Sequence, residues 1–135
     1  MYYYSSMTGG ESDTPTAAVT GDLRALTAER PYDGIERRTI IGRNSTVAIY
    51  EFAPGAEFPL HFHEQEQTTL VQEGQAHFIA GDQDVLLGVG GWSVIAPGVP
   101  HRVVAGPEGT RFIAVVAPAR AAGDYRLAAD PAPGS

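Results

Sequence analysis

Short runs of β-branched and aromatic residues, separated by turn residues, are the feature that most constrains the fold of this chain. Nine such runs follow one another from residue 36 onward: Glu36–Ile41, Ser45–Phe52, Glu57–Phe62, Gln67–Gln72, Gln75–Ala80, Gln83–Leu87, Trp92–Ile95, His101–Ala105 and Arg111–Val116. Proline and glycine between the runs, as in Ala53–Ala56 and Ala96–Pro100, supply the backbone geometry that reverses a strand. Many short strands with almost no helix predict an all-β sandwich or barrel.

One domain should account for nearly the whole chain. The 135 residues are enough to close one hydrophobic core and too few for two. Before the first run, Gly21–Arg30 predicts at most one short helix, with Asp22 placed to cap it. Residues 1–20 and 131–135 are rich in small and polar residues without periodicity, so we expect flexible ends. The single domain is then predicted over residues 21–130.

The composition excludes several kinds of chemistry. Cysteine and lysine are absent, which removes disulfides, thiolate nucleophiles and Schiff bases. A net charge of -7 argues against a nucleic acid partner and favours a small molecule. No apolar run approaches the roughly 20 residues that cross a bilayer. Because the N-terminus also lacks the pattern of a secretory signal, we expect a cytoplasmic protein that contacts no membrane.

The four histidines carry most of the remaining chemistry. His61 and His63 are two residues apart, which on a strand places both imidazoles on one face, about 6 to 7 Å apart. His101 follows directly after a Pro-Gly-Val-Pro turn. An isolated pair of this kind is also common on a solvent-exposed strand, so the surrounding pattern decides between the two interpretations.

That pattern resembles the two motifs of the cupin superfamily. In the first motif a glycine, a His-x-His pair, an acidic residue and a second glycine follow at fixed intervals, and the matching positions are Gly55, His61, His63, Gln67 and Gly74. In the second, glycines precede a histidine after a proline-containing turn, and the matching positions are Gly90, Gly98 and His101. The resemblance implies a cupin jelly roll with a metal site. The chain departs from the motifs at Ala96, Ala105 and Gln67, and only Gln67, in place of an acidic ligand, changes the chemistry.

We expect a fourth ligand, because Gln67 replaces the acidic residue of the first motif. The resemblance implies that the strand carrying His77 lies beside the strand of His101. The alternation along Gln75–Ala80 leaves open which face is inward, and the other interpretation is a buried imidazole bonded to a backbone carbonyl. We predict His61, His63, His77 and His101 as metal ligands, with Gln67 as a hydrogen-bonding neighbour or weaker ligand. Imidazole suits zinc, iron and nickel, and zinc is the expected ion.

A narrower resemblance suggests an activity. The stretches RPYDGIERRTI, EFAPGAEFPLHFHEQEQTTLVQEG and GWSVIAPGVPHRV look like the small cupin-type cyclases of aromatic polyketide biosynthesis, of the tetracenomycin and resistomycin types and most nearly the latter. This resemblance implies a metal-dependent cyclase that closes and aromatises a poly-β-ketone, free or carrier-bound, in antibiotic biosynthesis. The alternatives are an iron-dependent dioxygenase or monooxygenase, and a non-catalytic polyketide-binding scaffold.

Three further expectations concern single regions. The resemblance to small cupins implies a homodimer formed near Glu36–Ile41. Trp92 and Phe112 are expected in the core. No general base is identified, and Tyr50 is one candidate among the acidic and tyrosine side chains.

Overall fold

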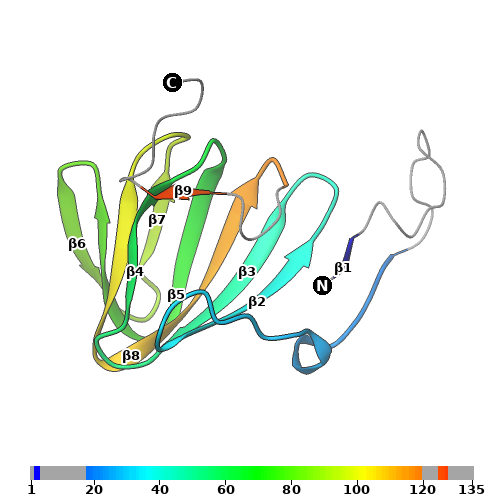
Figure 1. The fold of residues 1–135 in the computed structure, drawn as a ribbon, viewed down its shortest axis with the longest axis horizontal. Coiled ribbons are helices and arrows are strands. Elements are labelled where there is room, and N and C mark those ends of the chain that lie inside the picture. Colours follow the sequence, from blue (N-terminus) through cyan, green and yellow to red (C-terminus); the bar gives the residue numbers. More distant parts are fainter. Residues whose placement is uncertain (1, 4–17, 120–124, 128–135) are drawn as a thin grey trace.

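The computed structural model describes residues 2–3, 18–119 and 125–127, and most of them belong to one strongly curled sheet (Figure 1). The strands are β1 (Tyr2–Tyr3), β2 (Ile35–Ile41), β3 (Thr46–Phe52), β4 (Glu57–Phe62), β5 (Glu66–Ala80), β6 (Gln83–Leu87), β7 (Trp92–Ile95), β8 (His101–Ala117) and β9 (Arg126–Leu127). All pairings except that of β1 with β2 are antiparallel. The prediction of an all-β jelly roll is confirmed.

Two long strands, β5 and β8, run through the whole molecule and divide the sheet into two layers. The second half of β8 pairs with β3 and with the first half of β5, whereas its first half pairs with β4 and with the second half of β5. We call layer A the part that contains β2, β3 and β7, and layer B the part that contains β4, β6 and β9. Tyr50 of layer A contacts Phe58 of layer B, with 6.1 Å between the ring centroids, so the layers face each other.

A glycine lies where β5 bends from one layer to the other. The sequence pattern predicts two separate runs here, and the structure joins them into one strand with register shifts on both sides of Gly74. Gly74 has a φ of 67°, and a Cβ at this position would overlap the carbonyl oxygen of Gly109 on β8. A glycine is therefore required where the two long strands cross closely. The two predicted runs of β8 are likewise one strand.

The core lies between the layers and is built from alternate residues of each strand. Four aromatic residues of the core are between 2% and 5% exposed: Phe52, Phe58, Phe78 and Phe112, so the prediction for Phe112 is confirmed. The prediction for Trp92 is wrong, because β7 turns Ile95 inward and leaves Trp92 67% exposed. The alternation of β7, rather than the size of the indole, decides which side chain enters the core.

The N-terminal segment contains less helix than its pattern allows. Only the single 3-10 turn η2 (Leu23–Ala25) forms within Gly21–Arg30, and the Asp22 carboxylate accepts a hydrogen bond of 2.8 Å from the Arg24 backbone amide, as the predicted cap. Of the ends expected to be flexible, residues 1, 4–17 and 131–135 lie outside the described residues, and Tyr2–Tyr3 pair with Ile40–Ile41. Within the described ranges, no helix is long and apolar enough to cross a membrane.

Candidate metal centre

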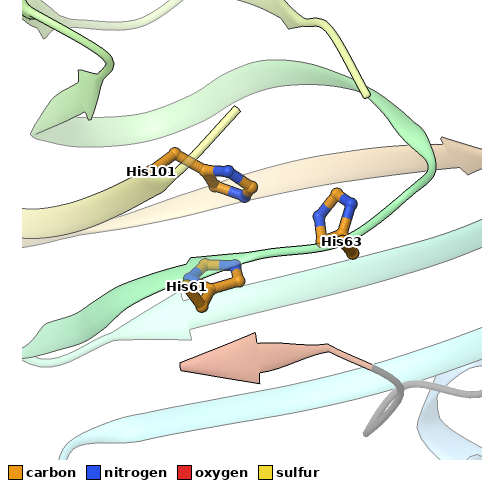
Figure 2. A group of neighbouring side chains, drawn as sticks. All are labelled: His61, His63 and His101. Atoms are coloured by element: carbon orange, nitrogen blue, oxygen red, sulfur yellow. The ribbon is translucent and has the colours of Figure 1, made fainter. Parts of the chain in front are cut away.

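Three of the four histidines meet inside the jelly roll. His61 lies on β4 directly opposite His101, the first residue of β8, and His63 follows β4 in the next bend. Figure 2 shows the three imidazole rings turned toward one another. The turn before His101 is fixed to the same bend, since the Gly98 amide donates a hydrogen bond of 2.8 Å to the His63 carbonyl oxygen. The two sequence motifs therefore converge in space, as predicted.

The spacing of the rings is that of a potential metal site. The ring centroids of His61 and His101 are 4.1 Å apart, those of His63 and His101 4.9 Å, and those of His61 and His63 5.8 Å. One nitrogen of each ring lies within 4.8 Å of one nitrogen of the other two. All three side chains are buried, with exposures of 2% to 6%. Three imidazole nitrogens this close in an apolar interior are the donor set of a transition-metal site.

Backbone carbonyls set the orientation of each ring. The Nδ1 atoms donate to the carbonyl oxygens of Pro59, Gln65 and Val99, at 2.8, 3.0 and 2.9 Å respectively. A carbonyl only accepts, so each Nδ1 carries a proton, and each ring in its neutral form presents the Nε2 lone pair. Fixing the tautomer through the far nitrogen is the usual support for metal-ligating histidine. The three residues are thus held in the state that binds a cation.

Gln67, which belongs to layer A, contacts one of the three histidines. It lies on β5 between Ile95 and Val116 in the register, is 7% exposed, and places its Oε1 atom 3.1 Å from His63 Nε2. Its amide nitrogen donates to Thr69 Oγ1 at 3.1 Å. An amide oxygen only accepts, so this contact is a hydrogen bond when His63 Nε2 carries a proton, and in the Nδ1–H tautomer both atoms can offer a lone pair to the same cation. Gln67 is therefore among the residues able to contact a metal.

His77 does not join the other three, and the predicted four-histidine set is corrected to three. Its neighbours Ala76 and Phe78 are the buried residues of this part of β5, so His77 points out of layer B and its side chain is 48% exposed. Its Nδ1 atom lies 2.9 Å from the Asp84 carboxylate on β6. The alternation along this strand is compatible with either face pointing inward. The contact of Phe78 with Phe112 places Phe78 in the core, so His77 points outward.

Aromatic rings line the interior on the side of His61. The Phe58 and Tyr125 rings lie 4.5 and 5.2 Å from the His61 ring. The hydroxyls of Tyr125 and Tyr32 share a hydrogen bond of 2.9 Å, which ties the segment before β9 to the loop before β2. Tyr125 lies after the last predicted strand run, so no periodicity marked it. These rings give the three histidines apolar surroundings on one side.

A cavity of about 370 Å³ lies on the other side, against His101. It opens between β6, β7 and the first half of β8. Most of its lining is apolar, including Phe78, Leu87, Ile95 and Val103. The cavity therefore places a mostly apolar surface beside the imidazole of His101.

Arg37 is a buried charged residue that the sequence analysis did not predict. Arg37 points inward from β2, is 5% exposed, and lies 3.3 Å from the Glu29 carboxylate and over the Tyr50 ring. Burial lowers the pKa of Arg37, but Tyr50 and Glu29 outweigh it and hold the pKa above the ordinary value of arginine. Tyr50, a candidate base, is stacked on Phe112 at 5.0 Å. The place of Arg37 in the alternation Ile35–Ile41 is the signal that could have found it.

The fold and the three inward histidines define a class: a curled β-sandwich with a buried site that could hold a metal ion. Residues 48–116, 69 of the 135 residues, match the family model of the cupin domain. The chain belongs to the cupin domain family. No curated protein sequence matches it.

Several solved structures share the fold. An RmlC-like cupin from Shewanella frigidimarina is 25% identical with a TM-score of 0.70, and the match covers 77% of this chain and 94% of that one. KdgF from Halomonas is 22% identical with a TM-score of 0.66, covering 70% and 89%. Oxalate decarboxylase from Lactobacillus farciminis is 19% identical with a TM-score of 0.76, covering 86% of this chain and 38% of that one. The likeness extends over most of the chain.

Proposed function

We propose that this cupin is a metal-dependent polyketide cyclase, which closes a ring of a poly-β-ketone by intramolecular aldol reaction and loss of water. The observation that carries the proposal is the buried group of three imidazoles with fixed tautomers. Among the described residues no carboxylate belongs to this group. The motif resemblance to cyclases of the resistomycin type supplies the substrate class.

The residues present fit a divalent ion. His61, His63 and His101 would hold it through Nε2, because each Nδ1 is committed to a carbonyl oxygen. Gln67 Oε1 would add a neutral oxygen donor beside His63. Zinc is the ion we expect, since imidazole nitrogens suit it and the site offers no thiolate.

The neutral donors determine what such an ion can do. Imidazole and amide ligands cancel none of its charge, so an ion held by these residues would supply strong Lewis acidity toward the carbonyl oxygens of a β-diketone. The surrounding apolar side chains exclude water, which strengthens this electrostatic effect. A site of this composition favours chemistry in which negative charge develops on an oxygen atom.

The interior walls would select how the substrate folds. Phe58 and Tyr125 pack beside His61, and the apolar cavity opens beside His101. A flexible poly-β-ketone confined between these surfaces loses most of its alternative conformations before reaction. Holding the two reacting carbons in contact is an orientation effect that can supply a large part of the rate enhancement.

The test combines metal analysis with product analysis. The chain is purified without added metal, its zinc and iron contents are measured, and it is added to a reconstituted aromatic polyketide synthase. We expect bound zinc and a shift from spontaneous products to one cyclised product, with loss of that shift in His61→Ala. His77→Ala is the matched control, because His77 is outside the metal centre and should retain the shift.

Two results would overturn the cyclase proposal in distinct ways. Tightly bound iron with oxygen uptake on a β-diketone would assign an oxygenase instead. A product shift that survives replacement of His61, His63 and His101 by alanine would assign a scaffold that shapes the polyketide without metal catalysis.

A further inference from the structure

A cleft runs into the jelly roll between the edges of β6 and β7. In the described part of the chain each of these strands pairs with β5 alone, so each has a free edge. The cavity of about 370 Å³ opens here, and its lining includes both Trp92, 67% exposed, and His101, 2% exposed. The cleft therefore leads from the surface to the candidate metal centre, and its volume is that of a site for a small organic molecule.

The inner surface of β6 is apolar and uncovered. Val85 pairs with Phe78 of β5, which is 5% exposed, so both side chains lie on the inner face of layer B. Leu87 pairs with the buried Ala76 in the same way. Val85 is nevertheless 46% exposed. An inward apolar residue with this exposure shows that layer A does not cover the inner face at β6, which leaves an apolar wall open to a ligand.

The opposite wall offers a hydrogen-bonding group. Ser93 of β7 pairs with Thr69, which is 0% exposed, so the Ser93 side chain lies on the inner side of layer A. Ser93 lines the cleft, and its Oγ atom is buried without a hydrogen-bond partner among the residues that the structure describes. A buried hydroxyl in this state is unfavourable, so an oxygen atom of a bound molecule would satisfy it.

The charges of the lining favour a neutral ligand. The arginine in the lining, Arg102, lies 3.5 Å from the Glu57 carboxylate, and Asp82 is exposed at the opening. A carboxylate or phosphate would therefore find no unpaired arginine here. An aromatic ring matches the apolar wall, and oxygen substituents on such a ring can meet Ser93 on one side and the site of His101 on the other.

We propose that this cleft binds a flat, neutral aromatic ring with oxygen substituents, and that Val85 and Ser93 determine this specificity. The inference deepens the proposed function and rests on it, since it places a ring of the polyketide in the cleft while the ketones still to react lie beside His101. Trp92 adds a second aromatic surface at the opening and, as the only tryptophan, reports on the occupant.

Binding of 2-acetyl-1-naphthol to the full chain tests the proposal without turnover. This probe is flat and neutral, and its neighbouring hydroxyl and ketone resemble the enol of a β-diketone. Titration calorimetry with Zn²⁺ present measures the affinity, and quenching of Trp92 emission places the probe at the cleft. We expect binding with quenching, and a lower affinity by at least about tenfold in Val85→Asp and by about three- to tenfold in Ser93→Ala.

Leu86→Asp is the matched control. Leu86 follows Val85 on β6 and is 50% exposed, but it lies on the outer face of layer B, so the same change should leave affinity and quenching unaltered. Ser93→Ala keeps the test valid if Val85→Asp fails to fold. No binding, or binding that neither cleft variant weakens, would overturn the proposal. A Trp92 shielded from acrylamide only at high protein concentration would assign the cleft to a second copy and overturn it as well.

The measurement is separate from the test of the cyclase activity. A chain that binds the probe as expected but cyclises no polyketide would keep the cleft as a binding site for an aromatic molecule and exclude the proposed reaction. An active cyclase that does not bind the probe would keep the reaction and exclude the cleft as the binding site.

Discussion

The two layers of the jelly roll share β5 and β8, yet their outer faces differ. Layer A exposes apolar side chains on this face, among them Trp92 and Leu70. Layer B presents polar pairs in the corresponding place: His77 Nδ1 lies 2.9 Å from the Asp84 carboxylate, and Arg102 lies 3.5 Å from Glu57. The same pair of strands therefore carries a water-facing pattern in one half and an apolar pattern in the other.

The two layers also contribute different residues to the interior. Layer B supplies His61 and His101, and its outer face combines polar pairs with apolar residues such as Leu86. Layer A supplies Gln67 to the interior, and its outer face exposes Trp92 and Leu70. The strand β5 links them, because Gln67 and Leu70 lie three residues apart on opposite faces.

The largest loss of stability is expected for a residue that lies between the two layers. Phe112 is 2% exposed and contacts Tyr50, Phe52 and Phe78 with centroid distances of 5.0 to 5.3 Å. Phe112→Ala leaves a cavity between the layers and should lower the free energy of unfolding by about 3 to 5 kcal/mol. Urea denaturation measures this, with Leu86→Ala as the exposed control, expected within about 0.5 kcal/mol of the native chain. Equal losses for both variants would contradict a common core between the layers.

The next largest effect is expected on Zn²⁺ affinity, when one of the proposed metal ligands from layer B is removed. His101→Ala removes one of three imidazoles from the buried group, so affinity for Zn²⁺ should fall at least about 100-fold, more than the loss of a residue that only supports a ligand. Competition with a chromophoric chelator measures the affinity. His77→Ala, a histidine on the outer face of the same layer, should bind Zn²⁺ as the native chain does. Zinc affinity unchanged in His101→Ala would exclude the proposed site.

Local sequence signals predicted much of this architecture. Alternation and turn residues predicted the strands, and the spacing of His61, His63 and His101 predicted their convergence, because a strand and a tight turn fix side-chain direction over a few residues. The position of Trp92 was not predictable in the same way. The hydrophobicity of the indole predicts burial, but it does not show which face of β7 carries Trp92.

The orientation of His77 was also not predictable from the local sequence. Both faces of its strand contain apolar residues, so only the long-range packing of Phe78 on Phe112 reveals that His77 points outward. The bends of β5 and β8 were also missed, because a glycine such as Gly74 signals a turn and a strand crossing equally well in sequence. What sequence could not supply in each case is a contact between residues far apart in the chain.

A smaller change in Zn²⁺ affinity is expected for Gln67, the residue that layer A contributes to the site. Gln67→Glu places a carboxylate 3.1 Å from His63 Nε2, in the position of the native amide oxygen, and its negative charge should raise Zn²⁺ affinity about tenfold. Gln67→Leu, of similar volume and without a donor atom, should lower the affinity. Titration calorimetry of both variants measures the two directions. If neither differs from the native chain, Gln67 does not contact the metal.

The smallest effect should come from the outer face of layer B. His77 and Asp84 form an exposed pair, and exposed ion pairs contribute little because water screens the charges. His77→Ala should therefore change the free energy of unfolding by at most about 0.5 kcal/mol, as measured by urea denaturation, and Asp84→Ala should behave alike. Thr68→Val, at an exposed position on the outer face of layer A, replaces a hydroxyl group with a methyl group and should change the free energy of unfolding by no more than about 0.5 kcal/mol as well. A larger loss for His77→Ala than for Phe112→Ala would reverse the assignment of inner and outer faces on β5.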